Sequence, residues 1–271
     1  MDTMNGYDEE VTFLSRKLLD LNKQLIESEK AKSRFLSLVA NELNDPMTAL
    51  LGLIPRLKPD EKNSHQAIFG LVHQEALLLD FRIQNLVAAA QIESGEIDTT
   101  YASVKPETIV KEAIEDLKYL IQRNNILISI HDTLMRPVIS DPRKLYLIVK
   151  NLIANGCTYG LTDSIVDISI TESSSTLVIA VNNQGDGPKV EFKPQVFTRF
   201  AEGLEGEHGL GLGLSIVREL CESLKGNVDY TADKSWVTFT VTLPLETTLP
   251  DSDACGSNEF LFESFDDAVE F

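Results

Sequence analysis

Hydrophobic positions in the first third of the chain follow the alternating three- and four-residue spacing of a coiled-coil seam. A first seam is followed by a second that is out of phase with it by four residues, and a third follows the turn-like segment 58–63. The pattern predicts a coiled-coil lead-in helix over 1–34 and an antiparallel helical hairpin over 35–95. The seams consist, in order, of Leu14, Leu18, Leu21 and Leu25; Leu36, Ala40, Leu43, Met47, Leu50, Ile54 and Leu57; and Phe69, Val72, Ala76, Leu79, Ile83, Leu86 and Ala90.

A hairpin of this kind has one apolar stripe and is polar elsewhere, so it cannot bury the stripe by itself. Pairing two copies would bury both stripes in a four-helix bundle. We therefore expect a homodimer. An ordinary coiled coil without a signalling role would produce the same seams.

The helical pattern breaks at Ser94-Gly95, and shorter helical and strand-like runs alternate beyond it. Asp141-Pro142 supplies an N-cap and a first-turn proline for one helix, and Gly226 ends another. The pattern predicts a separate α+β domain over 96–245. Its expected helices cover 106–123, 142–159 and 212–224, and its expected strands cover 126–130, 165–170, 177–181, 228–231 and 236–243.

The formal net charge of -18 is unevenly spread, because residues 246–271 carry eight Asp or Glu and no Lys or Arg. So acidic a chain repels the nucleic-acid backbone and the anionic membrane surface, which argues against either as a direct partner. We expect the acidic tail over 246–271 to be disordered. Its phenylalanines leave open a role in binding a partner or packing on the preceding domain.

Gly209, Gly211 and Gly213 occupy every second position of a loop that opens directly into a predicted helix. Such glycines let backbone N–H groups approach phosphate oxygens, and the helix dipole adds partial positive charge. The loop alone could also be only a tight strand-to-helix connection. Other segments that precede this loop in the sequence favour the phosphate-binding interpretation.

Three segments precede this loop in a fixed order: 150–155 (KNLIAN), 183–187 (NQGDG) and 196–200 (VFTRF). With the glycine loop they resemble the N, G1, F and G2 boxes of the histidine-kinase ATP-binding domain. That resemblance implies a Bergerat-type (GHKL) α/β sandwich, a fold also found in heat-shock chaperones, type II topoisomerases and mismatch-repair ATPases.

The resemblance also implies ATP and Mg²⁺ as cofactors. Asn155 matches the residue whose amide oxygen holds Mg²⁺, and Asn183 stands where the family has an Asp that accepts a hydrogen bond from adenine. An Asn oxygen can still accept that bond, without the assistance of charge. Thr158 and Leu210 replace residues that often contact phosphates in the family. The other implied ATP-binding residues are Asn151, Tyr159, Gly185, Gly187, Gly209, Gly211, Leu212 and Gly213.

Residues 35–46 resemble the family's H box, with Asn41 at the position of the phosphate-accepting histidine and Glu42 at that of the adjacent base. A carboxamide nitrogen is a poor nucleophile because its lone pair is delocalised into the carbonyl. We therefore expect no phosphate on Asn41. Asp45 stands where many members have a Thr or Asn that helps dephosphorylate the response regulator.

Cys157, Cys221 and Cys255 are widely spaced and form no C-x-x-C pair, as is typical of reduced cytoplasmic thiols. The sequence has neither an apolar run near 18 residues nor a basic, apolar leader. We expect a cytoplasmic chain without direct membrane contact, alone or as the cytoplasmic part of a larger sensor.

The sequence leaves three functional hypotheses. The first is a pseudokinase that binds ATP and acts through a response regulator receiver domain or a partner histidine kinase. The second is an active histidine kinase that phosphorylates a partner chain in trans. The third is a working kinase in which Asn41 is an engineered replacement of histidine.

Overall fold

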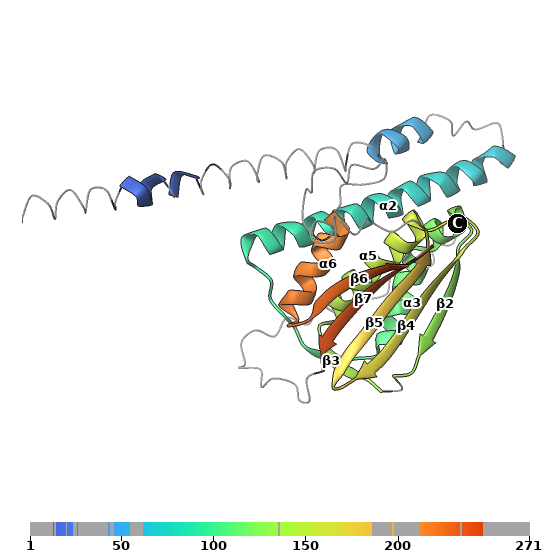
Figure 1. Cartoon of the computed structure of the whole chain (residues 1–271). Coiled ribbons are helices and arrows are strands. Elements are labelled where there is room, and N and C mark those ends of the chain that lie inside the picture. Colours follow the sequence, from blue (N-terminus) through green and yellow to red (C-terminus); the bar gives the residue numbers. More distant parts are fainter. Residues whose placement is uncertain are drawn as a thin grey trace, which may run out of the picture.

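The N-terminal part of the described chain is helical. Residues 46–53 form a helix, and the long helix α2 spans Lys62–Ser94. Helix α2 agrees with the second helix of the predicted hairpin, whereas most of the predicted lead-in helix and of the H box lie outside the described residues. The computed structural model describes residues 13, 15–19, 21–23, 26, 43, 46–54, 62–134, 136–185, 197, 212–233 and 235–245 (Figure 1).

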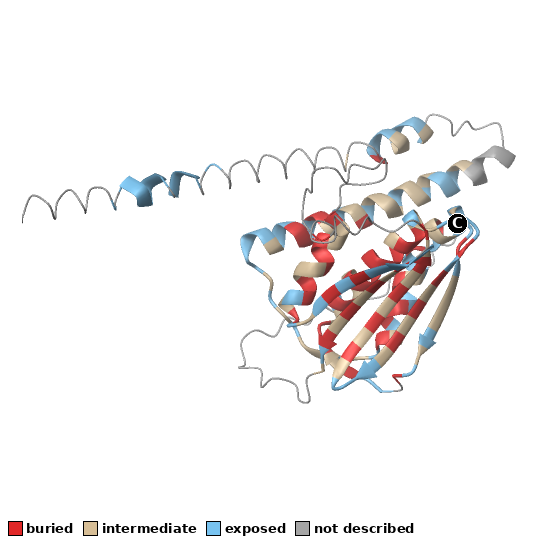
Figure 2. Ribbon diagram, viewed as in Figure 1, coloured by how far each residue is buried: buried red, intermediate tan, exposed pale blue. Residues whose placement is uncertain are grey.

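A five-stranded mixed sheet forms the framework of the second domain, in the order β2-β4-β5-β7-β6. Strands β2 and β4 run parallel, and the other neighbouring pairs are antiparallel. Buried and partly exposed residues alternate along the central strands (Figure 2), so one face of the sheet is turned to the core. The strands are β2 (Leu127–Asp132), β4 (Ile165–Ser173), β5 (Thr176–Gln184), β6 (Asn227–Asp233) and β7 (Trp236–Pro244).

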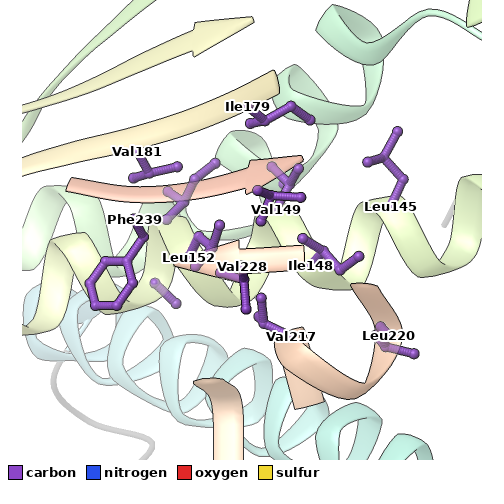
Figure 3. Packing of buried hydrophobic residues seen from close by; sticks show 14 of the residues in the cluster. Leu145, Ile148, Val149, Leu152, Ile179, Val181, Val217, Leu220, Val228 and Phe239 are labelled. Carbon is purple, nitrogen blue, oxygen red and sulfur yellow. The ribbon is translucent and has the colours of Figure 1, made fainter. Parts of the chain in front are cut away.

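A layer of helices covers that face. Helices α5 (Pro142–Tyr159) and α6 (Leu212–Ser223) pack on the sheet, and α3 (Pro106–Asp116) packs on α5 (Figure 1). The core therefore lies between one sheet and one helical layer, as the predicted α/β sandwich requires. Figure 3 shows core residues from both layers, among them Leu145, Ile148, Val149, Leu152, Ile179, Val181, Val217, Leu220, Val228 and Phe239.

The prediction of one helix over 106–123 is wrong. The chain leaves helical geometry at Leu117 (φ -94°, ψ 7°), which separates α3 from the short helix α4 (Lys118–Arg123). Leu117 is fully buried and Tyr119 is 8% exposed. The free energy gained by burying these two side chains offsets the free energy lost where the helical turn is interrupted. No glycine or proline marks this break, so the pattern did not reveal it.

A small two-stranded antiparallel sheet was also missed. It pairs β1 (Ala102–Val104) with β3 (Val138–Ser140). Strands of three residues are too short to display a period of two. Their pairing places the segment that follows α2 beside the start of α5, where the backbone N–H of Thr100 donates to Asp141 Oδ2 at 2.8 Å.

Helix α2 presents apolar residues on two faces. Phe81, Ala88 and Ala89 belong to the core that includes the second domain, and α2 lies against α6. By contrast, the seam residues Phe69 and Ile83 are 59% and 42% exposed. Part of the predicted seam is thus exposed. Neither α2 nor any other helix in the described part of the chain is long and apolar enough to cross a membrane.

The buried cysteines give a first testable prediction. Burial raises the pKa of the Cys157 thiol to about 12 and does the same for Cys221, with Glu222 adding to the effect. At pH 8 both thiols are therefore protonated, and the reactive thiolate is scarce. Iodoacetamide should leave both cysteines unmodified in the folded protein and alkylate them in urea, as measured by peptide mass spectrometry. Rapid alkylation of either one in the folded protein would contradict the buried placement.

Candidate nucleotide-binding site

Helix α5 carries the residues of the predicted N box. Asp141 caps its start, accepting hydrogen bonds from the N–H groups of Arg143 and Lys144 at 3.0 Å each, and Pro142 follows the cap as expected. Leu152 and Ile153 are fully buried. These apolar residues hold α5 on the sheet and so set the direction in which its polar residues face.

Asn151, Asn155 and Tyr159 lie four residues apart and share one side of α5. Their exposure rises along the helix, because Asn151 is 5% exposed, Asn155 is half-buried and Tyr159 is 53% exposed. The three predicted N-box residues therefore form a row from the interior to the surface. Asn155, in the middle of this row, is partly buried and still accessible to solvent.

Asn183 lies beside this row, on the inner face of β5. It continues the buried positions Leu177, Ile179 and Val181, and it is 4% exposed. A Cβ added at Gly156, the residue after Asn155, would lie 3.6 Å from the Cβ of Asn183. The structure therefore brings the predicted adenine-binding amide next to the N-box helix.

Gly185 lies where β5 meets the end of α5. A Cβ at this position would lie 2.7 Å from the backbone oxygen of Tyr159, closer than real Cβ contacts come, so the approach requires glycine. The N–H of Leu161 also donates to Gln184 O at 2.8 Å. The predicted G1 residue thus joins the two elements that carry Asn155 and Asn183.

Leu212 and Gly213 form the start of α6. A Cβ at Gly213 would lie 2.7 Å from Asn151 Oδ1, so the first turn of α6 packs directly on the N-box helix. That first turn contains no acidic residue. The N–H groups at the start of a helix lack intrahelical partners and favour a nearby anion.

This donor set fits a nucleotide with Mg²⁺. No group of three or more His, Cys, Asp or Glu side chains in the described ranges could hold a metal by itself. Mg²⁺ commonly binds through one or two protein oxygens together with phosphate oxygens and water. Asn155 could supply such an oxygen, and the start of α6 could receive phosphate.

Asn151 already makes three hydrogen bonds to protein groups. Its Nδ2 donates to Asn85 Oδ1 at 2.8 Å and to Leu147 O at 2.9 Å, and its Oδ1 accepts from Asn85 Nδ2 at 3.0 Å. Asn85 belongs to α2, 66 positions away in the sequence. Sequence reasoning missed this contact, since nothing in the heptad pattern distinguishes Asn85.

Lys150 forms a second contact with α2 that the sequence did not indicate. Although charged, it is 3% exposed. Its Nζ lies 2.7 Å from Tyr146 Oη, 3.1 Å from Asp116 Oδ2 and 3.2 Å from Gln84 Oε1. Burial and a hydrogen bond to Asp116 raise the pKa of the Tyr146 hydroxyl. The Lys150 ammonium also lies 5.2 Å from the ring centre of Phe81 on α2.

Other predicted site residues can be placed only in part. The Thr158 hydroxyl donates to Ala154 O at 2.7 Å, so its hydrogen is turned back onto its own helix. The predictions for seven further residues lie outside the described part of the chain: Asn41, Glu42, Asp45, Gly187, Gly209, Leu210 and Gly211.

The sequence and the fold are both similar to those of known proteins. Residues 140–247 match the family model described as histidine kinase-, DNA gyrase B-, and HSP90-like ATPase. The match includes α5, β4, β5, α6, β6 and β7. It therefore covers the described residues of the predicted N, G1 and G2 boxes, whereas the contacts from α2 and from Asp116 lie outside it.

Two curated relatives extend the similarity over most of the chain. Sensor histidine kinase CssS of Bacillus subtilis is 21% identical over 87% of this chain and 52% of its own length. The heme sensor protein HssS of Staphylococcus haemolyticus is 24% identical over the same shares of the two chains. The chain therefore spans about half the length of these relatives.

Solved structures show the same fold. The histidine kinase AdeS of Acinetobacter baumannii superposes with a TM-score of 0.56 at 22% identity, over 75% of this chain and 97% of that one. Full-length ShkA in complex with AMPPNP superposes with a TM-score of 0.57 at 17% identity, over 83% and 46%. The predicted histidine-kinase type of ATP-binding fold is confirmed.

Proposed function

We propose that this chain is a two-component signalling module that binds ATP with Mg²⁺ but does not capture phosphate at residue 41. The observation that carries the proposal is the grouping of Asn155, Asn183 and the start of α6 around the C-terminal half of α5. These groups suit three parts of one ligand. Asn155 would hold Mg²⁺, Asn183 would accept a hydrogen bond from the adenine amino group, and Leu212 and Gly213 would offer N–H groups to phosphate.

Residue 41 decides what such a module can do with the nucleotide. Histidine attacks phosphorus through the lone pair of a ring nitrogen, whereas the lone pair of the Asn41 amide nitrogen is delocalised into the carbonyl. Glu42 would then have no nucleophile to activate. The chain would act by binding a response regulator receiver domain or a partner histidine kinase.

The exposed part of the seam supports dimer formation. In addition to Phe69 and Ile83 of α2, the seam residues Met47 and Ile54 in and just after the preceding helix are 49% and 51% exposed. Apolar residues at heptad spacing on two helices are typical of a bundle interface. We propose that a second copy of this chain covers them.

Replacing Asn41 with histidine tests the proposal directly. Both proteins should bind ATP with Mg²⁺ in calorimetry with affinities within about threefold of each other, because residue 41 is not part of the proposed nucleotide site. Only the Asn41→His protein should become labelled by γ-labelled ATP. Label mapped to residue 41 of the unaltered protein would contradict the proposal, and so would a complete lack of ATP binding by both.

The unaltered protein should then be mixed with candidate partner kinases and labelled ATP. Label transferred to a partner whose own ATP site has been inactivated would support phosphorylation in trans. Binding without such transfer would support the pseudokinase.

A further inference from the structure

The contact between α2 and α5 reaches the interior end of the row of N-box residues. Phe81, Gln84 and Asn85 of α2 contact Lys150 and Asn151 of α5. Asn155 lies one helical turn beyond Asn151. A helix of the hairpin is thus connected to the candidate nucleotide site by direct hydrogen bonds.

The orientation of the Asn151 amide follows from its partners. Leu147 O can only accept, so it identifies the side of the amide that carries the N–H₂ group. The Asn85 amide then pairs with both ends of the Asn151 amide, accepting at 2.8 Å and donating at 3.0 Å. These bonds fix one rotamer of Asn151 in a region from which water is almost excluded.

The fixed amide in turn packs on α6. Its oxygen lies 2.7 Å from the position that a Cβ of residue 213 would take, which is too close for a real Cβ. Asn151 is therefore held between Asn85 on one side and the first turn of α6 on the other. A change in the Asn151 rotamer would alter how α6 begins relative to α5.

We propose that Asn85 is a positioning residue of the nucleotide site, which acts through Asn151 to hold the first turn of α6 against α5. Docking of α2 then raises nucleotide affinity, because the N–H groups of α6 are placed before the phosphates arrive. This inference rests on the proposed nucleotide-binding function. By linkage, bound nucleotide must also strengthen the docking of α2.

The buried lysine assists this arrangement. Gln84 accepts from Lys150, and the Phe81 ring covers the ammonium group. Separation of α2 from α5 would remove both partners from a cation that is 3% exposed. Lys150 thus favours the docked position of α2 in which Asn85 reaches Asn151.

The test compares Asn85→Ala, Asn85→Asp and the control Gln91→Ala, which removes an exposed amide from the same helix. Calorimetry with ADP and Mg²⁺ measures affinity, and hydrogen exchange without nucleotide measures protection of residues 212–223. Asn85→Ala should weaken ADP binding about three- to tenfold and speed exchange in the first turn of α6. Gln91→Ala should change neither.

Asn85→Asp separates hydrogen bonding from packing. It preserves the volume of the side chain, but one carboxylate oxygen would face Asn151 Oδ1 in place of a donor. We expect a loss of ADP affinity at least as large as for Asn85→Ala, and a purely space-filling role would leave affinity unchanged. In an Asn151→Ala background, Asn85→Ala should have no further effect on affinity.

The outcomes distinguish this inference from the function on which it rests. ADP binding that is equal in the unaltered protein and in Asn85→Ala would overturn the inference and leave the proposed function intact. Absence of ADP binding in the unaltered protein would refute the proposed function. In that case unchanged exchange in α6 of Asn85→Ala would overturn the positioning role, and faster exchange would support it.

Discussion

Asn155→Ala is expected to weaken the binding of ADP in the presence of Mg²⁺ on the order of a hundredfold. The half-buried Asn155 lies between the enclosed Asn151 and the exposed Tyr159, and its amide oxygen is the proposed protein ligand of the metal. Removing a metal ligand loses the bond and leaves the cation with water in a confined site. Calorimetric titration with ADP, with and without Mg²⁺, measures the effect.

The most stringent test of this prediction is whether the loss of ADP affinity requires Mg²⁺. Without the metal, Asn155→Ala and the unaltered protein should bind ADP about equally. Thr158→Ala is the matched control on the same helix, because the Thr158 hydroxyl is used within α5. It should change affinity by no more than about twofold. Equal loss with and without Mg²⁺ would show that Asn155 does not act through the metal.

Leu152→Ala is expected to lower the free energy of unfolding by about 2–5 kcal/mol. Leu152 is fully buried and lies in the core between α5 and the sheet (Figure 3). The substitution removes apolar contacts and leaves a cavity that the helices can close only in part. Urea denaturation followed by far-ultraviolet circular dichroism measures the change.

Leu161→Ala provides the control of identical chemistry. Leu161 is 56% exposed, so its truncation should change the free energy of unfolding by no more than about 0.5 kcal/mol. Similar effects of the two substitutions would argue against the position of α5 in the core. The comparison matters for the site, since Leu152 lies between Asn151 and Asn155 and helps to hold both in place.

Much of the second domain could be predicted because its signals are local. Asp141-Pro142 marks the start of α5, and Gly226 follows the end of α6. Alternating apolar residues indicated β4, β5 and β7, although each strand extends beyond its predicted C-terminal end. The helix break at Leu117 and the pairing of β1 with β3 carry no such signal. Both result from contacts with parts of the chain that are distant in sequence.

The sequence by itself determined the kinds of residue that the candidate site contains, their order and the helical spacing of Asn151, Asn155 and Tyr159. That spacing follows from the geometry of one helix. Only the tertiary structure decided how accessible each residue is and which partner it meets. Asn151 and Asn155 are the same residue type on one side of α5, yet Asn151 pairs with Asn85 of α2. The reason is that side-chain pairing depends on which surfaces pack together, and the pattern within a single helix does not contain that information.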